Sequence, residues 1–482
     1  MPAAIGPYDG RKARRKRCDS CAKQQIKCSG GIPCQHCIRT YRTCEITPKK
    51  TGISFVVVQQ GPSGKKTKSR NPRLHDDVTT LPLITLVSAK GTEYYVSYFF
   101  EFFMSMNAFT SQKSLINHEL TAMLQHSPAL RDAIEAVAAL HSQQRKSLAV
   151  CTSNKENNIE ALKAYARSVS CVQKKITAGT FLVDQSALWV TFILGIFELM
   201  RDSTGTNWLS HFLHGTSTML RLQDPETLSS QDPLNSQRRS FFLATRIFEI
   251  SRSFIFSDPS FLSNPEWTAA VSRLWEGEGA ALWHPKEALF DMLPRFSDLS
   301  VRAIHFCDAA PQMSPHAQRT LAKSLAGEGF LLQALLQQWW LDASSWQQAL
   351  QAQADTESSI GFIYYHATSI YLSGTYDYHP YWTASEAPIL CRDDINWHVF
   401  EIVRLAHELL TQGVAGILLF FPLRVAGARA NDEGCRSTIL HLLGMTVERG
   451  FKVAEAFIED LSGLWMRIDS LCAVQHATVN EN

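Results

Sequence analysis

The amino-acid sequence predicts a mostly α-helical protein, in which a small cysteine-rich module and a flexible linker precede a large all-helical domain. Three observations lead to this prediction. Six of the twelve cysteines fall within residues 18–44. The stretch from Cys44 to about Leu81 is rich in Lys, Gly, Ser, Thr and Pro, and apolar residues recur at helical spacing from about residue 95 almost to the end. With 482 residues, 45% of them hydrophobic, the chain can bury a substantial core.

Charge is distributed unevenly along the chain. Residues 1–75 contain 17 Lys and Arg against three Asp and Glu, which gives a net charge of +14. The remaining residues carry 30 basic and 42 acidic side chains, a net charge of −12. Clustered basic residues release counterions when they neutralise phosphates, so the N-terminal part is expected to bind a polyanion.

Neither a secretory signal nor a membrane span is expected. The first residues turn basic without an apolar stretch of signal length. The most hydrophobic later run, residues 187–200, is 14 residues long and contains Glu198, whereas a bilayer span needs about 20 apolar residues. This run is therefore expected to be a buried core helix. In an intracellular chain, cysteines are expected to be reduced thiols or metal ligands.

The clustered cysteines form a pseudo-repeat, in which two C-x2-C pairs are each followed six residues later by a further cysteine. The six are Cys18, Cys21, Cys28, Cys34, Cys37 and Cys44. Tetrahedral zinc needs four ligands, so six thiolates can hold two zinc ions only if two of them bridge both metals. Unrelated redox motifs and a disulfide-rich knot are the alternatives, but neither requires the six-residue spacing to recur.

In these cysteines, their spacing and Pro33, the sequence resembles the fungal binuclear zinc cluster family of transcription factors. The resemblance implies that Cys18 and Cys34 bridge the ions, with Cys21 and Cys28 completing one site and Cys37 and Cys44 the other. Both ions would be structural, because no coordination position remains open. A module this small has little apolar core, so zinc would supply its folding free energy, roughly 10–16 kcal/mol per ion.

A basic arm, residues 1–17, precedes the cluster and contains the run from Arg11 to Arg17. Such a run is expected to contact DNA phosphates and to act as a nuclear localisation signal, which places the protein in the nucleus. Residues 22–27, after Cys21, are expected to form a short helix that enters the major groove. The residues expected to contact double-stranded DNA are Arg14, Arg15, Lys16, Arg17, Lys23, Gln24, Gln25 and Lys27.

Two glutamines distinguish this module from its relatives, which commonly carry a basic pair at these positions to read a CGG triplet. Gln24 and Gln25 stand there instead. Glutamine pairs bidentately with adenine, whereas Lys and Arg favour guanine, so the DNA motif stays open. A flexible linker is expected over residues 45–90. Residues 45–95 contain no run of apolar heptads, and dimerisation therefore stays open as well.

Residues 91–475 are expected to form the helical domain. Ser127 is expected to cap a helix that starts at Pro128, and Gly179 to end a helix over residues 159–176. Apolar periodicity predicts further helices over residues 185–201, 207–222, 238–256, 318–340, 356–373, 396–421 and 435–470.

This region resembles the fungal-specific helical transcription factor domain. The resemblance is carried by the stretches 127–130, 138–141, 211–216 and 422–427, and by Trp465. It implies a regulatory domain that contacts the transcription machinery or co-regulators and, in some relatives, a small-molecule effector.

Markers of enzymes are missing from the sequence: there is no G-x-S-x-G elbow, no phosphate loop, no H-E-x-x-H helix and no G-x-G-x-x-G turn. A non-enzymatic protein is expected. His211 and His214 are expected to pack or cap rather than to bind metal. The aromatic residues 94–103 and 339–340 are expected to form core or interface packing, with a ligand pocket lined by them as the alternative. The scattered thiols are expected to be buried: Cys151, Cys171, Cys307, Cys391, Cys435 and Cys472.

Two functions remain open on these grounds. The first is a sequence-specific regulator of RNA polymerase II genes, more often an activator in this family, which controls a secondary-metabolite or nutrient-use gene cluster. The second is a DNA-anchored scaffold without sequence preference, whose helical domain recruits other factors.

Overall fold

The computed structural model describes two compact units, residues 10–83 and residues 84–482 together with residues 1–9. Within them it describes residues 34–40, 91, 93–107, 113–149, 158–206, 212–228, 233–276, 280, 283–349, 355–414 and 416–480. In the first unit the described part is Cys34, the short helix α2 (Gln35–Arg39) and Thr40.

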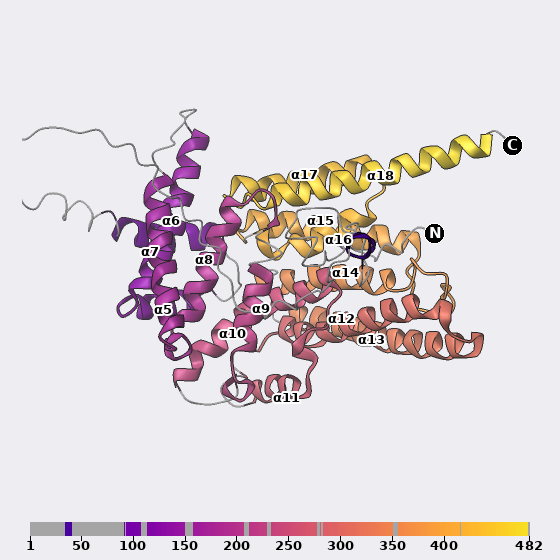
Figure 1. The fold of residues 1–482 in the computed structure, drawn as a ribbon, viewed down its shortest axis with the longest axis horizontal. Helices are drawn as coiled ribbons and strands as arrows, with labels where there is room; N and C mark the ends of the chain where they lie inside the picture. Colours follow the sequence, from indigo (N-terminus) through magenta and orange to yellow (C-terminus); the bar gives the residue numbers. More distant parts are fainter. Residues whose placement is uncertain are drawn as a thin grey trace, which may run out of the picture. The chain divides into compact units, whose positions relative to one another are not determined.

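The described part of the second unit consists of helices and the turns between them (Figure 1). Those in its first half are η1 (Phe99–Phe103), α4 (Met104–Met106), α5 (Lys113–Leu124), α6 (Pro128–Ala149), α7 (Asn158–Thr177), η2 (Phe181–Val183), α8 (Ala187–Arg201), α9 (His214–Arg221), η4 (Pro225–Leu228), α10 (Pro233–Phe256), η5 (Phe261–Ser263) and α11 (Pro265–Leu274). Those in its second half are α12 (Pro285–Ala309), η7 (Ala310–Gln312), α13 (Pro315–Ala349), α14 (Thr356–Gly374), α15 (Arg392–Thr411), η8 (Gly416–Leu418), α16 (Phe420–Arg429), α17 (Glu433–Glu448) and α18 (Ala454–Asn480).

Several helix boundaries confirm the expected capping chemistry. The Ser127 Oγ accepts a hydrogen bond from the Leu130 N–H at 3.2 Å, and Pro128 occupies the first position of α6. Gly179, two residues beyond the end of α7, has φ +69°, the left-handed conformation that glycine adopts without steric cost. The helices expected over 185–201 and 356–373 correspond to α8 and α14.

Two of the expected long helices are wrong. Residues 396–421 form α15 and α16, because Gly413 turns the chain with φ +88° between them. Residues 435–470 form α17 and α18, separated at Gly450 with φ +98°. In both places apolar residues continue at helical spacing through the turn, so periodicity alone joins two helices into one.

Other differences concern length and omission. Helix α13 is 35 residues long and α10 begins at Pro233, so both exceed their expected ranges. Helix α9 begins at His214, and residues 207–211 of the helix expected over 207–222 lie outside the described residues. The 25-residue helix α12 was not expected, because Pro294 interrupts its sequence pattern.

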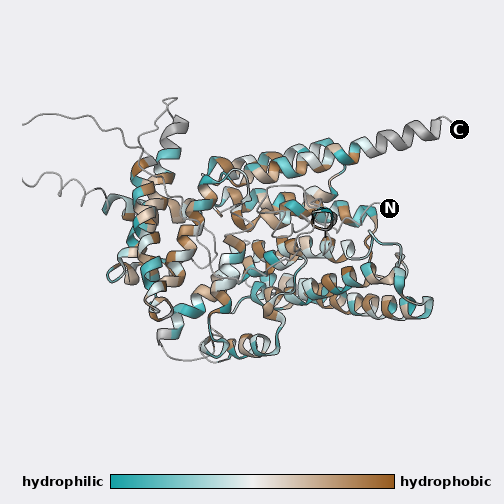
Figure 2. Cartoon of the chain, viewed as in Figure 1, coloured by the Kyte–Doolittle hydropathy of each residue, from teal (hydrophilic) through white to brown (hydrophobic). Residues whose placement is uncertain are grey.

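The most hydrophobic run forms a buried helix, as expected. Helix α8 packs beside α6 and α7, and ten of its side chains are buried (Figure 1). Among the described residues, no helix is both long and apolar enough to cross a membrane. Hydrophobic residues recur at intervals along the other helices, and hydrophilic residues lie between them (Figure 2).

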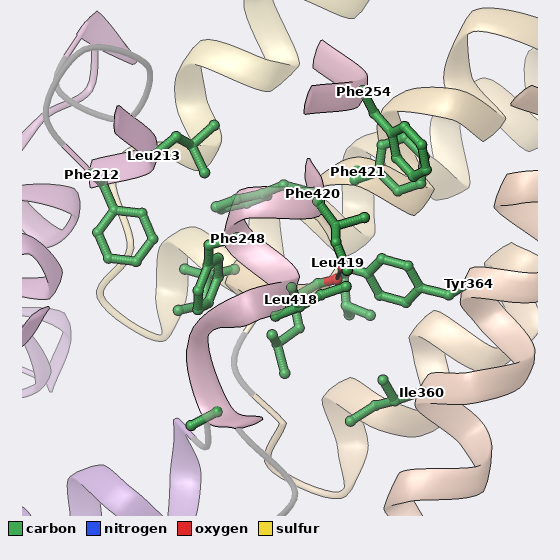
Figure 3. Close-up of a cluster of buried hydrophobic side chains, with 14 of the residues drawn as sticks. Phe212, Leu213, Phe248, Phe254, Ile360, Tyr364, Leu418, Leu419, Phe420 and Phe421 are labelled. Atoms are coloured by element: carbon green, nitrogen blue, oxygen red, sulfur yellow. Dashed lines mark hydrogen bonds between the residues drawn. The ribbon is translucent and has the colours of Figure 1, made fainter. Parts of the chain in front are cut away.

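Aromatic side chains from helices distant in sequence meet in the core of the helical unit (Figure 3). The Phe421 ring of α16 lies 4.9 Å from the Phe254 ring of α10 and 5.9 Å from the Tyr364 ring of α14, measured between centroids. The Tyr364 hydroxyl donates a hydrogen bond to the Leu418 carbonyl at 3.0 Å. The short turn between α15 and α16 is thereby fixed against α14.

Candidate metal centre and buried polar sites

Two of the six expected zinc ligands lie at the start of helix α2 and within it. Cys34 precedes the helix and Cys37 lies within it, and both side chains are buried. The Cys37 backbone N–H donates a hydrogen bond to the Cys34 Sγ at 3.4 Å. Such a bond favours the thiolate form of sulfur, which is the form that binds zinc, so these two residues fit a metal centre.

The C-terminal end of α2 reaches solvent. Arg39 is exposed in the last turn, and the Thr40 hydroxyl donates to the His36 carbonyl at 2.8 Å, which closes the helix. This short segment thus buries the thiols of Cys34 and Cys37 and exposes the guanidinium of Arg39. The other ligands and all the expected DNA contacts lie outside the described residues: Cys18, Cys21, Cys28, Cys44, Arg14, Arg15, Lys16, Arg17, Lys23, Gln24, Gln25 and Lys27.

In the helical unit, His214 packs against an aromatic ring, as expected. Its imidazole lies 4.7 Å from the Phe256 ring, and burial, together with the nearby Arg252, lowers the pKa of His214. His211 lies outside the described residues. Within the described ranges, His, Cys, Asp and Glu side chains form no group of three or more that could hold a metal ion.

The expectation that the scattered thiols are buried is wrong for Cys391, which is exposed. Cys391 is the N-cap residue of α15, and its Sγ accepts a hydrogen bond from the Asp394 N–H at 3.4 Å. The thiol therefore lies at the end of the helix and not within the core. Cys171, Cys307 and Cys435 are half-buried, and burial raises the pKa of Cys307 to about 12. Cys151 and the side chain of Cys472 are outside the described set.

The aromatic stretches are partly core. Phe99 and Phe103 are fully buried, whereas Tyr94 is exposed. Trp339 is buried, and its indole N–H donates to the Pro285 carbonyl at 2.7 Å.

A cleft of about 550 Å³ lies elsewhere, where α6 and α8 begin. Its floor includes Ser127 and Ser186, whose hydroxyl oxygens are 2.7 Å apart, and Asp184, which accepts the Ser186 hydroxyl at 2.9 Å. Lys175 forms an ion pair with Asp184. Ser127, Ser186 and Asp184 are thus hydrogen-bonded to one another, and none of the aromatic residues 94–103 or 339–340 lines the cleft.

A buried ion network, which sequence patterns did not indicate, joins α10 to α12. The Arg246 guanidinium lies 2.5 Å from a Glu287 carboxylate oxygen and also pairs with Asp291. Lys286 Nζ lies 2.7 Å from the other Glu287 oxygen. Burial raises the pKa of Glu287, but Lys286 and Arg246 outweigh it and hold the pKa below its ordinary value. The Trp275 indole N–H completes the network by donating to Asp291 at 2.8 Å.

A pair of buried histidines joins α14 to α15. The Nδ1 atoms of His366 and His398 are 2.8 Å apart, and both side chains are buried. Burial lowers the pKa of His398 to about 4. Burial and the proximity of His398 and Arg404 lower the pKa of His366 to about 3. Both imidazoles are therefore neutral in the folded protein at neutral pH.

This pair predicts a loss of stability in mild acid. Between pH 6.5 and about 4 the unfolded chain gains protons on both histidines while the folded chain does not, so the free energy of unfolding falls as pH falls. At pH 5 the loss is about 2 kcal/mol per histidine. Urea unfolding at pH 7 and pH 5 checks this: the double variant His366→Gln with His398→Gln should lose less stability between the two pH values. An unchanged difference contradicts the assignment, and the exposed His118→Gln serves as the control.

The stretches that carry the resemblance of the helical domain make packing contacts. His141 of α6 is held between the Tyr98 hydroxyl, 3.0 Å from Nδ1, and the Asn107 amide nitrogen, 3.0 Å from Nε2. The Trp465 indole N–H of α18 donates to the Gly427 carbonyl of α16 at 2.8 Å. A Cβ on Gly427 would lie 2.7 Å from the Leu461 side chain, so glycine allows the two helices to approach.

Comparisons with known proteins give two matches. The family described as "Fungal specific transcription factor domain" matches residues 93–476, and the family described as "Fungal Zn(2)-Cys(6) binuclear cluster domain" matches residues 16–52. No curated protein and no solved structure matches the chain.

Proposed function

Because the chain belongs to the fungal-specific transcription factor domain family and is a DNA-binding transcription regulator with a two-zinc cluster, we propose that it recognises defined promoter sequences in the nucleus and activates transcription. The single observation that carries this proposal is the zinc cluster match over residues 16–52. Both matching families are transcription factor domains rather than enzymes.

For the metal centre we infer that all six clustered cysteines bind the two zinc ions, with Cys18 and Cys34 as bridges. The buried position of Cys34 and its hydrogen bond from the Cys37 N–H support this ligand set. Bound zinc supplies the folding free energy that so small a module lacks. The protein parts are inferred to be a basic arm (1–17), the cluster (18–44), a linker (45–90) and the regulatory domain (91–475).

For DNA recognition, the pseudo-repeat offers a structural comparison. A shift of 16 residues superimposes Cys34 and Cys37 on Cys18 and Cys21, and it aligns the exposed Arg39 with Lys23. Lys23 is accordingly inferred to point away from the metals, toward DNA. Gln24 and Gln25 follow it and are inferred to face base edges, where glutamine favours adenine. Lys27 and residues 14–17 are inferred to contact phosphates, which position the module without specifying sequence.

Changing Gln25 to Lys is expected to shift preference toward CGG-containing duplexes. Lysine can bond to guanine O6 and N7, and a good base contact contributes roughly 1–3 kcal/mol of discrimination, which is about fivefold to 150-fold in relative affinity. Competition binding of the full chain to duplexes with and without a CGG triplet measures this shift in preference. The matched control is Lys49→Gln in the linker, which should leave the preference unchanged. If Gln25→Lys also leaves it unchanged, position 25 does not face bases.

A binding selection on random duplex DNA, with the zinc-loaded full chain, tests the proposal as a whole. An enriched motif supports a sequence-specific regulator. Uniform weak binding would support the alternative, a DNA-anchored scaffold whose helical domain recruits co-regulators.

The proposed activator role and the proposed target genes can be tested in cells of the source organism. We propose that the targets form a secondary-metabolite or nutrient-use gene cluster, and that a small-molecule effector can act through the helical domain. Deleting the gene should lower transcripts of neighbouring pathway genes; raised transcripts would instead assign a repressor.

A further inference from the structure

Helix α13 leaves an unusual face exposed. It packs against α12 and α14, and the opposite side points away from both. Leu331 is 64% exposed, Leu341 is 52% exposed, and Phe330 and Leu335 are also exposed. No charged residue occurs between Glu328 and Asp342. A long helix face that is both solvent-facing and free of charge is typical of an interaction surface.

The spacing of the exposed residues is that of a helix-pairing seam. The seam residues, which share the middle of this face and alternate at steps of three and four, are Ser324, Gly327, Leu331, Ala334, Gln338 and Leu341. Steps of three and four keep one stripe toward a partner helix. A Cβ on Gly327 would meet no atom within 4 Å, so space is open there for an incoming side chain.

The seam is complementary to itself when two copies run antiparallel. With a two-fold axis between residues 332 and 333, Leu331 of each copy lies level with Ala334 of the other. Leu341 lies level with Ser324, and Gln338 with Gly327. At each of these three levels a large side chain meets a small one, which allows close approach.

The charges at the two ends of the seam also favour antiparallel pairing of the two helices. Lys323 is exposed at the N-terminal end and Asp342 at the C-terminal end. Antiparallel pairing brings the Lys323 end of each helix to the Asp342 end of the other, whereas parallel pairing places like charges together. Opposed helix dipoles add to this preference.

We propose that α13 is a self-association surface, through which two copies of this chain pair antiparallel along Ser324–Leu341. The seam spans about 27 Å, because 18 helical residues rise 1.5 Å each. Its area is at the small end of specific interfaces, so association is expected to be weak and reversible. Two zinc modules joined in this way would bind neighbouring DNA sites with increased avidity.

Sedimentation equilibrium of the full chain without DNA tests the surface, at about 1 to 100 µM, the range in which so small an interface associates. The wild-type chain should form dimers, and Leu331→Asp should weaken dimerisation about tenfold or more. Met466→Asp is the matched control, because Met466 is 66% exposed on α18 and lies outside the seam. A monomer throughout the range, or a dimer that Leu331→Asp leaves intact, overturns the proposal.

A charge swap tests the direction. Lys323→Asp alone should weaken the dimer about twofold to fivefold, as for an exposed ion pair, and adding Asp342→Lys should restore it. Failure of the double variant to recover rules out the antiparallel arrangement. Circular dichroism of each variant must match the wild type, which is expected because all the altered side chains are exposed. Because the dimer is measured without DNA, its presence or absence does not depend on whether the binding selection on random duplex DNA yields a motif.

Discussion

Replacing Cys34 by alanine is expected to lower the bound zinc from two equivalents to less than one and to reduce DNA affinity to the non-specific level. The physical reason is that Cys34 is inferred to bridge the two ions, so its loss would leave each ion with three ligands. Specific sites are typically bound at least about a thousandfold more tightly than non-specific DNA, and that margin should disappear. Elemental analysis of the purified chain and binding titrations at fixed salt measure the two effects.

An outer ligand provides the comparison. Cys21→Ala should remove one zinc ion in preference to the other, and should cost less zinc than Cys34→Ala. Cys171→Ala, on the half-buried side of α7, should change neither property. Equal zinc loss in the Cys34 and Cys21 variants would contradict the bridging role, and two full equivalents in Cys34→Ala would exclude Cys34 as a ligand.

The second large effect is expected at Glu287, whose side chain is fully buried. Replacing it by Gln should lower the free energy of unfolding by about 3–5 kcal/mol, because Arg246 and Lys286 would keep buried positive charges without their main partner. The Asp291 carboxylate cannot compensate fully, since burial raises its pKa and so disfavours its charged form. Urea unfolding at neutral pH measures the loss.

Two further variants show whether the lost stability comes from the unpaired buried charges or from altered packing. Glu328→Gln removes one of the two carboxylates that pair with the exposed Arg302 and should cost less than about 1 kcal/mol. Combining Glu287→Leu with Arg246→Met should recover part of the stability lost in Glu287→Gln, because apolar side chains of similar volume need no partner. A loss at Glu287 no larger than at Glu328 would show that the buried network is energetically unimportant.

The sequence predicted most of the helices where capping residues and periodicity agree, as at Ser127, Pro128 and Gly179. It failed at Gly413 and Gly450, because apolar periodicity ran on through both turns. Helix α12 escaped notice because Pro294 breaks the pattern, although the helix tolerates the proline in its interior. The sequence predicted a helix over residues 318–340 but not the exposed seam of α13, because apolar periodicity does not state which side of a helix its neighbours cover.

The sequence by itself determined the zinc cluster, because ligand number and spacing are local properties that metal geometry constrains. Helical class and family followed in the same way, from short-range pattern and motif. Only the tertiary structure decided what meets across the fold: Arg246 with Glu287, His366 with His398, and Trp465 with Gly427. Such pairs join residues tens of positions apart. Their energies depend on burial and distance, which a linear sequence does not contain until the chain has packed.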